Sequence, residues 1–131
     1  MPRKLPQARL IADMFPLWRQ VTIVTDHAKG ASARLAGLEV PSYPDTETTL
    51  AELQARIAKT IAFLKSIPDS AYEGAEARTI TVKAGPRELT FPALQYLHSY
   101  AVPNFYFHMT TTYNILRANG VDVGKVDFLG G

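Results

Sequence analysis

Two parts of the chain carry apolar residues at three- and four-residue steps, the spacing that gathers them on one face of an amphipathic helix. In the first part, this stripe comprises Phe15, Trp18, Val21, Thr22, Thr25, Ala28 and Ala33. Asp13 can cap the start, Pro16 suits the first turn, and Gly37 follows the last apolar residues as a stop. We therefore predict a helix over residues 13–36, with Gly30 as its weakest point.

The second amphipathic part begins at Thr49, which has Glu52 three residues later and so has the spacing of a capping box. The apolar residues that follow at helical spacing are Leu50, Leu53, Ile57, Ile61 and Leu64. We predict a helix that ends before Pro68. The last four of these apolar residues are expected in the core, where truncating Ile57 or Ile61 to alanine costs roughly 2–5 kcal/mol.

An extended connection and a β-hairpin are predicted around this second helix. Residues 38–48 contain two prolines and suit a surface connection between two helices. Residues 78–82 and 87–91 alternate between polar and apolar positions, and residues 83–86 carry the chemistry of a hairpin turn. Because a two-stranded hairpin is marginal alone, it is expected to pack on the helices.

The last predicted helix runs from Pro92 to the Asn119-Gly120 pair, a typical C-terminal stop. Pro103 removes a backbone donor inside it and is expected to kink or divide it. The tail beyond Gly120 has no periodicity. Two of its apolar residues are candidates for docking on the bundle, Phe128 and Leu129. The elements together predict an all-α class with a small β-hairpin insertion.

Composition limits the partners and the location of the protein. A chain of 131 residues with 47% hydrophobic residues suffices for one domain, taken here as residues 1–131. The formal charge is +2 and the charged residues are spread along the chain, which gives no case for nucleic acid. There is no cysteine, no apolar run of about 20 residues and no secretory signal pattern. We expect a cytoplasmic protein outside the membrane.

The candidate chemistry rests on three histidines, His27, His98 and His108, the only side chains that titrate near neutral pH. Antiparallel packing of the first and last helices can bring His27, His108 and Asn104 around one pocket. His98 lies about 80° from His108 around an unbroken helix. The alternative is that these histidines are structural, since two imidazoles and an amide make a poor metal site. Asp26 points away from His27 and suits solvent or a lysine partner.

Other polar and aromatic groups have both functional and structural interpretations. Threonines 110–112 can bind a ligand, although helical threonines commonly bond the preceding turn. The aromatic cluster suits either a ligand cavity or a core or interface. It consists of Tyr96, Tyr100, Phe105, Tyr106, Phe107 and Tyr113. The chain has no glycine-rich phosphate loop and no serine elbow.

Four segments, residues 9–16, 26–30, 103–108 and 116–121, resemble an uncharacterised family of unknown function in the DinB/YfiT-like superfamily. The resemblance covers nearly the whole chain. It implies an up-down four-helix bundle that is often dimeric. The best-understood members of this superfamily hold a divalent metal, usually zinc or nickel, with three histidines. The superfamily includes thiol-dependent transferases and isomerases.

Transferred onto this chain, the resemblance makes His27 the ligand from the second helix of the bundle and His108 the later histidine of the pair on the last helix. Asn104 stands where the earlier histidine of that pair would be, so one imidazole is absent. The candidate metal ligands are therefore His27, His108 and Asn104, and the candidate metals are zinc and nickel.

The resemblance also implies that the first helix of the bundle is missing, which leaves three long helices and an exposed apolar groove. A second copy of the chain is the simplest cover, so we expect a homodimer. Two functions stay open. One is binding of a small molecule or a divalent metal in an inter-helix pocket. The other is a non-catalytic helical homodimer or interaction protein with structural histidines.

Overall fold

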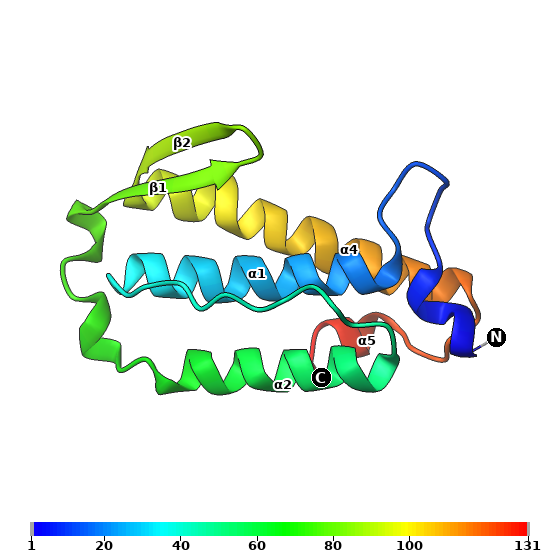
Figure 1. The fold of residues 1–131 in the computed structure, drawn as a ribbon. Coiled ribbons are helices and arrows are strands. Elements are labelled where there is room, and N and C mark those ends of the chain that lie inside the picture. The colour runs from blue at the N-terminus through cyan, green and yellow to red at the C-terminus, as the bar shows by residue number, and fades with distance from the viewer. Residues whose placement is uncertain (1, 131) are drawn as a thin grey trace.

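Three long helices run side by side, and a β-hairpin lies over one end of the bundle (Figure 1). The computed structural model describes residues 2–130. The long helices are α1 (Leu17–Leu35), α2 (Leu50–Ser66) and α4 (Val102–Ala118), and the hairpin consists of β1 (Thr79–Ala84) and β2 (Arg87–Pro92). The short helical segments are η1 (Pro2–Gln7), η2 (Asp69–Tyr72), η3 (Ala75–Ala77), α3 (Ala93–Gln95), η4 (Tyr96–Ala101) and α5 (Lys125–Phe128). The predicted all-α class with a hairpin insertion is confirmed.

Helix α1 is the central element, because it packs against both α2 and α4. It begins four residues later than Asp13, at Leu17, so the predicted cap at Asp13 is wrong. Pro16 restricts the residue before it to extended backbone, which keeps Phe15 out of a helix. The end was predicted correctly: Gly37 takes φ of 74° and its neighbour Leu38 donates its N–H to the carbonyl of Ala33.

Helix α2 starts on the predicted capping box. The Glu52 N–H donates to Thr49 Oγ1 at 3.1 Å, and the Thr49 N–H donates to Glu52 Oε1 at 3.1 Å. Its core face is different from the predicted one. Ile57 and Ile61 are 39% and 46% exposed, so their assignment to the core is wrong and the cost of core truncation does not apply to them.

The residues that α2 buries against α1 are Leu53, Arg56 and Thr60, three positions at helical spacing. Ile57 and Ile61 each follow one of these by one residue, which turns them about 100° around the helix, toward the space between α2 and α4. Leu64 is half-buried at the edge of the same space. The apolar residues do recur at helical spacing, as predicted, but Ile57, Ile61 and Leu64 line a groove and not the core.

Arg56 fastens the connection between α1 and α2. Its guanidinium is buried and lies 2.7 Å from Asp26, 3.2 Å from Asp45 and 3.2 Å from Glu47. Its Nε also donates to Thr25 Oγ1 at 2.7 Å. The connection is extended, as predicted, and this single side chain ties it to both helices.

The hairpin forms where it was predicted, with Ile80 opposite Phe91 and Val82 opposite Leu89. Ile80 and Val82 are buried in one hydrophobic cluster with Ala93, Tyr96 and Ala101. The two strands are therefore stabilised by packing on the helical segment that follows them.

The last helical segment is continuous in sequence but changes its winding. The segment η4 (Tyr96–Ala101) is a π-helix, and α4 begins directly after it with Pro103 in its first turn. Pro103, predicted to kink or divide the helix, follows the change from π- to α-helical winding by two residues, and the chain stays helical through it. The predicted stop is also found, with Asn119 as the C-cap and Gly120 at φ of 80°.

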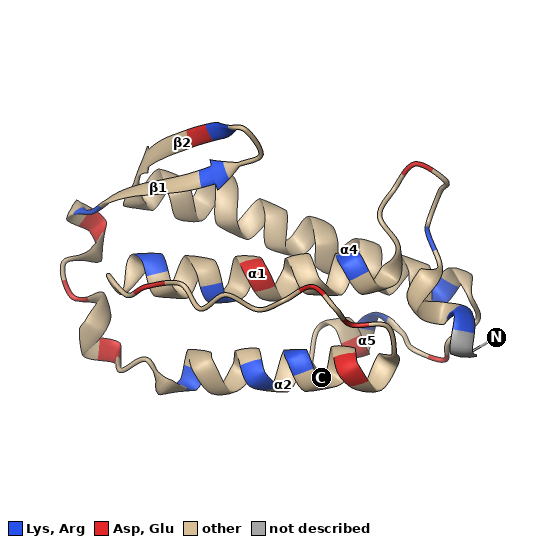
Figure 2. Cartoon of the chain, in the orientation of Figure 1, with Lys and Arg blue, Asp and Glu red and all other residues tan. Residues whose placement is uncertain are grey.

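The charged residues and the tail follow no single face of the bundle. Basic and acidic residues are spread over α1, α2 and the hairpin, whereas α4 carries no charged residue before Arg117 (Figure 2). Phe128 docks edge-on against Tyr113, with ring centroids 5.9 Å apart, whereas Leu129 is 67% exposed and does not dock. Within residues 2–130, no helix is long and apolar enough to cross a membrane.

Candidate functional site

His27 on α1 and His108 on α4 lie side by side at the centre of the bundle. Their ring centroids are 6.1 Å apart and their planes are within 11° of each other. Tyr100 packs edge-on against His27, with centroids 5.8 Å apart. The structure therefore brings together two of the three predicted site residues. They come from the two helices that the sequence analysis expected to pack against each other.

A buried glutamine fixes the ring of His108. Gln20 Oε1 lies 2.7 Å from His108 Nδ1, and Gln20 Nε2 donates to the carbonyl of Phe15 at 3.2 Å. Because the amide nitrogen of Gln20 is on Phe15, its oxygen faces the imidazole and accepts the Nδ1 proton. Neutral His108 is thus the Nδ1–H tautomer, and its Nε2 keeps a free lone pair.

Both imidazoles favour the neutral form. Burial is the main cause that lowers the pKa of His27 from 6.5 to about 4, and the proximity of His108 and Arg34 lowers it further while Asp26 opposes the shift. Burial also lowers the pKa of His108, assisted by the positive charge of Arg19. At neutral pH the pair consists of two uncharged groups that can accept a hydrogen bond or a proton.

The third predicted ligand, Asn104, is turned into its own helix. Its Nδ2 donates to the carbonyl of Tyr100 at 2.8 Å. Asp26, next to His27 in the sequence, is paired with Arg56 at 2.7 Å and with Lys29 at 3.3 Å. His98 is exposed on η4.

The donors do not complete a resident zinc or nickel site. Catalytic zinc sites use three protein ligands, and here two imidazoles are available. Among residues 2–130 no group of three His, Cys, Asp or Glu side chains could hold a metal ion.

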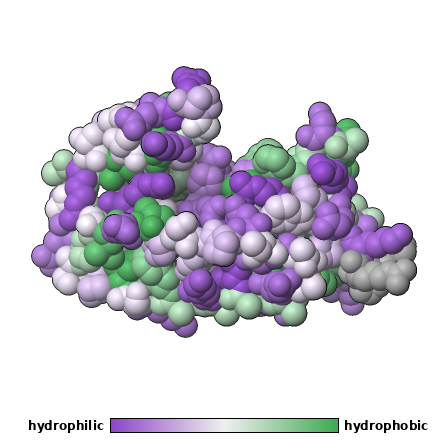
Figure 3. Space-filling model, in the orientation of Figure 1, coloured by the Kyte–Doolittle hydropathy of each residue, from purple (hydrophilic) through white to green (hydrophobic). Residues whose placement is uncertain are grey.

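His27 lines a cavity between α1 and the hairpin, and His108 lies behind it, outside the lining. The cavity has a volume of about 510 Å³. It is lined by Phe15, Arg19, Ile23, Asp26, His27, Arg34, Val82, Lys83, Ala84, Gly85 and Tyr100. Figure 3 shows the molecule hollowed between the hairpin and the loop that precedes α1.

Sequence reasoning missed Gln20, Arg34 and Lys83. Gln20 lies seven residues before His27, two helical turns away on the same face, and a glutamine inside an apolar stripe was the available signal. Lys83 was assigned only to the turn. The side of the hairpin that covers α1 depends on tertiary packing, which the sequence pattern does not give. Two threonines of the 110–112 run have their structural role, since Thr111 Oγ1 and Thr112 Oγ1 donate to the carbonyls of Phe107 and His108 at 2.8 Å each.

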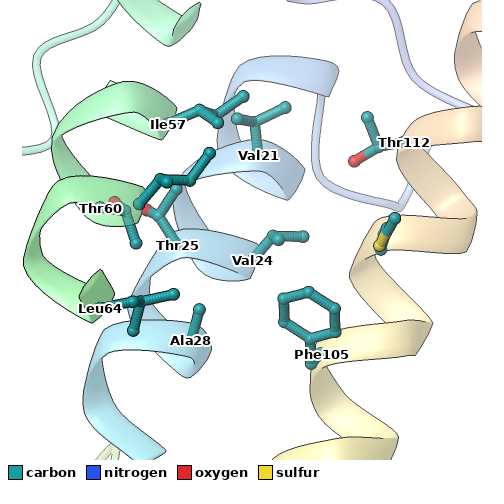
Figure 4. Close-up of a pocket in the computed structure, with 11 residues that line it drawn as sticks. Val21, Val24, Thr25, Ala28, Ile57, Thr60, Leu64, Phe105 and Thr112 are labelled. Carbon is teal, nitrogen blue, oxygen red and sulfur yellow. The ribbon is translucent and has the colours of Figure 1, made fainter. Parts of the chain in front are cut away.

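A second feature, the apolar groove, lies between α1, α2 and α4, with side chains of all three helices turned toward it (Figure 4). Its volume is about 390 Å³. It is lined by Val21, Val24, Thr25, Ala28, Ile57, Thr60, Ile61, Leu64, Phe105, Met109 and Thr112. The hydroxyls of Thr25, Thr60 and Thr112 donate to backbone carbonyls of their own helices. Their protons are therefore not available to a ligand in the groove.

These features define a DinB-like helical bundle with a histidine pair. The crystal structure of a DinB family member protein from Shewanella denitrificans has the same fold, with a TM-score of 0.89 and 42% sequence identity. The match covers 98% of this chain and 73% of that chain, so about a quarter of that protein lies outside it.

Residues 1–129 match the family described as a domain of unknown function, DUF1993. The chain belongs to this family, and the predicted resemblance to a DinB-like family of unknown function is confirmed. No functionally curated protein matches the chain.

Proposed function

We propose that this protein binds a small molecule at the His27–His108 pair and in the open cavity beside it. The observation that carries the proposal is the hydrogen bond from His108 to buried Gln20, which orients the imidazole and leaves its Nε2 with a free lone pair. Neutral imidazoles beside a cavity of this size suit a ligand that donates hydrogen bonds.

The test is a fragment screen followed by amide chemical shifts in the full chain. We expect fragments to shift the amides of Ala28, Tyr100 and the hairpin turn, because Ala28 follows His27 in the chain and the others line the cavity. His27→Gln and His108→Gln should each weaken the best fragment about tenfold, the loss of one charge-neutral hydrogen bond in a buried site. His98→Gln, on the exposed side of η4, is the matched control and should bind as the parent does. Fragments that map elsewhere, or that ignore both variants, would overturn the proposal.

A divalent metal is the second candidate ligand of the same pair. Two imidazoles on one zinc ion, each about 2.0–2.1 Å away through nitrogen, have centroids roughly 5–6 Å apart, close to the 6.1 Å found here. Water or a bound ligand would have to fill the remaining positions. Zinc and nickel chloride therefore form two further arms of the titration, with elemental analysis of protein purified without a histidine tag. Metal content near zero after incubation with both ions would remove this candidate.

We also propose that the apolar groove is covered by a second copy of the chain. Ile57 and Ile61 line it and are partly exposed, and a two-fold axis near them would seat each α2 against its partner in antiparallel orientation. In that arrangement Glu52 in the first turn of α2 approaches Lys65 in the partner's last turn. Two 17-residue helices share about 26 Å of length, enough to bury more than the roughly 1,000 Å² of a specific interface.

Light scattering across a dilution series tests this association. We expect a mass of twice 14.5 kDa, falling to 14.5 kDa in Ile61→Glu, because a carboxylate at the centre of the interface would be desolvated without a partner. Ile11→Glu is the matched control, since Ile11 is 61% exposed and does not line the groove. A 14.5 kDa species at every concentration of the parent chain would refute the dimer.

A further inference from the structure

The cavity beside the histidine pair carries more positive than negative charge. Three cationic side chains line it, Arg19, Arg34 and Lys83, against one carboxylate, Asp26. Asp26 lies 2.7 Å from Arg56 and 3.3 Å from Lys29, neither of which lines the cavity, whereas Arg19 is 3.9 Å away. The carboxylate is thus engaged mainly outside the cavity. Arg19 also lies 3.7 Å from Asp45, which leaves Arg34 and Lys83 as the two cavity cations without an ion pair.

Arg34 is the cation whose position is most defined. The guanidinium folds back over Gly30, where a Cβ would lie 2.6 Å from Nη1, so glycine at this position makes room for it. Nη1 donates to the hydroxyl of Tyr96 at 3.1 Å. Among residues 2–130 no carboxylate lies within 4.0 Å of this half-buried guanidinium, although it has five donors.

Lys83 approaches the same cavity from the hairpin. It lies opposite Glu88 in the strand register, yet the two side chains do not form an ion pair within 4.0 Å. Two cations from separate elements, α1 and β1, therefore border one space without a carboxylate partner. Arg34 is half-buried and Lys83 is exposed, so an anion in this space would gain most from Arg34 and be assisted by Lys83 at the rim.

The remaining walls are apolar. Phe15 stands at one end, next to the guanidinium of Arg19, which lies 5.7 Å from the ring centroid. Tyr100, Ile23 and Val82 provide further apolar surface. A ligand that satisfies both parts of the lining has a charged head and an apolar body.

We propose that the cavity binds an organic carboxylate with an aromatic or other apolar body, its carboxylate on Arg34 and Lys83 and its body against Tyr100 and Phe15. Arginine matches a carboxylate with two parallel hydrogen bonds, which sets the ligand class. The inference rests on the proposed small-molecule function, and it adds a carboxylate and an apolar body to the hydrogen-bond donor that the imidazoles would accept.

Benzoate and benzamide form a matched pair of probes, equal in shape and different in charge. Titration of the full chain followed by amide chemical shifts should show benzoate shifting residues of the hairpin turn and around Tyr100, with an affinity at least tenfold above that of benzamide. Arg34→Gln should abolish this preference and Arg34→Lys should restore part of it. Lys83→Gln, at an exposed position that the fold tolerates, should weaken benzoate severalfold. Arg87→Gln, on the hairpin but outside the cavity lining, is the control and should leave binding unchanged.

The outcomes separate this inference from the proposed function. Equal shifts from benzoate and benzamide at cavity residues would leave a small-molecule site and overturn its preference for anions. Benzoate binding that persists equally in Arg34→Gln and Lys83→Gln would also overturn the inference. The inference is also overturned if neither probe shifts the cavity residues while fragments bind at the histidine pair. In that case the ligand would contact the imidazoles without Arg34 and Lys83.

Discussion

Replacing Arg56 with alanine is expected to cost about 3–5 kcal/mol of the free energy of unfolding, the range for breaking a buried ion pair from one side. Arg56 is 3% exposed and contacts Asp26, Asp45 and Glu47. Its loss leaves Glu47, whose side chain is 13% exposed, without a guanidinium partner in a poorly hydrated place. The extended connection between α1 and α2 also loses its main tether. Urea denaturation followed by circular dichroism measures the change.

Lys59→Ala is the matched control for this variant. Lys59 is exposed on the same helix, and its ammonium lies 4.1 Å from the centroid of Tyr43, a ring that Arg56 also contacts at 5.4 Å. An exposed cation over an aromatic ring contributes only about 0.5–1 kcal/mol. Equal losses from the two variants would mean that the buried network contributes no more than a surface contact, contrary to the expectation.

Acidification is expected to destabilise the protein through His27. The pKa of its imidazole is 6.5 in an unstructured chain and about 4 in the fold, so the unfolded chain binds the proton more readily between these values. Stability is therefore complete above pH 6.5, falls as the pH drops toward 4, and changes no further from this group below that. The loss is at most about 3 kcal/mol, and smaller because the half-buried imidazole keeps part of its hydration. Burial lowers the pKa of His108 as well, so it adds to the loss with the same sign.

Urea denaturation at pH 7, 5.5 and 4.5 tests this dependence against His27→Gln, which cannot titrate. The variant should lose much of the slope between pH 6.5 and 4, while His98→Gln, at an exposed position, should keep it. A slope that is unchanged in His27→Gln would assign the acid sensitivity to other groups, His108 or carboxylates, and contradict the expectation.

The features of this fold that the sequence predicted well are local ones. The Thr49 capping box, the Gly37 stop and the hairpin turn each depend on residues a few positions apart, and all three are found. The start of α1 was misplaced because the restriction that Pro16 imposes on Phe15 outweighs the capping tendency of Asp13.

The environment of an apolar face is a tertiary property. The spacing of Ile57 and Ile61 correctly predicted a helix, but whether a helical stripe meets a core or an open groove depends on the number of neighbouring helices. Three packed helices leave that side of α2 uncovered. The same limit applied to the site. The approach of His27 to His108 follows from two adjacent helices, whereas the roles of Gln20 and Arg34 needed the depth and direction of each side chain.

The π-helical segment η4 sets the rotation, about the helix axis, of the residues before it relative to those of α4. Each residue of a helix advances the chain by about 100° around its axis. A chain with one residue fewer in η4 would carry Tyr96 and the hairpin around to a different side of α1, while Asn104 and His108 kept their places on α4. The length of this short segment therefore helps to decide which residues, Tyr100 among them, face the histidine pair. Homologous chains that differ in length here would combine the same two imidazoles with a different cavity lining.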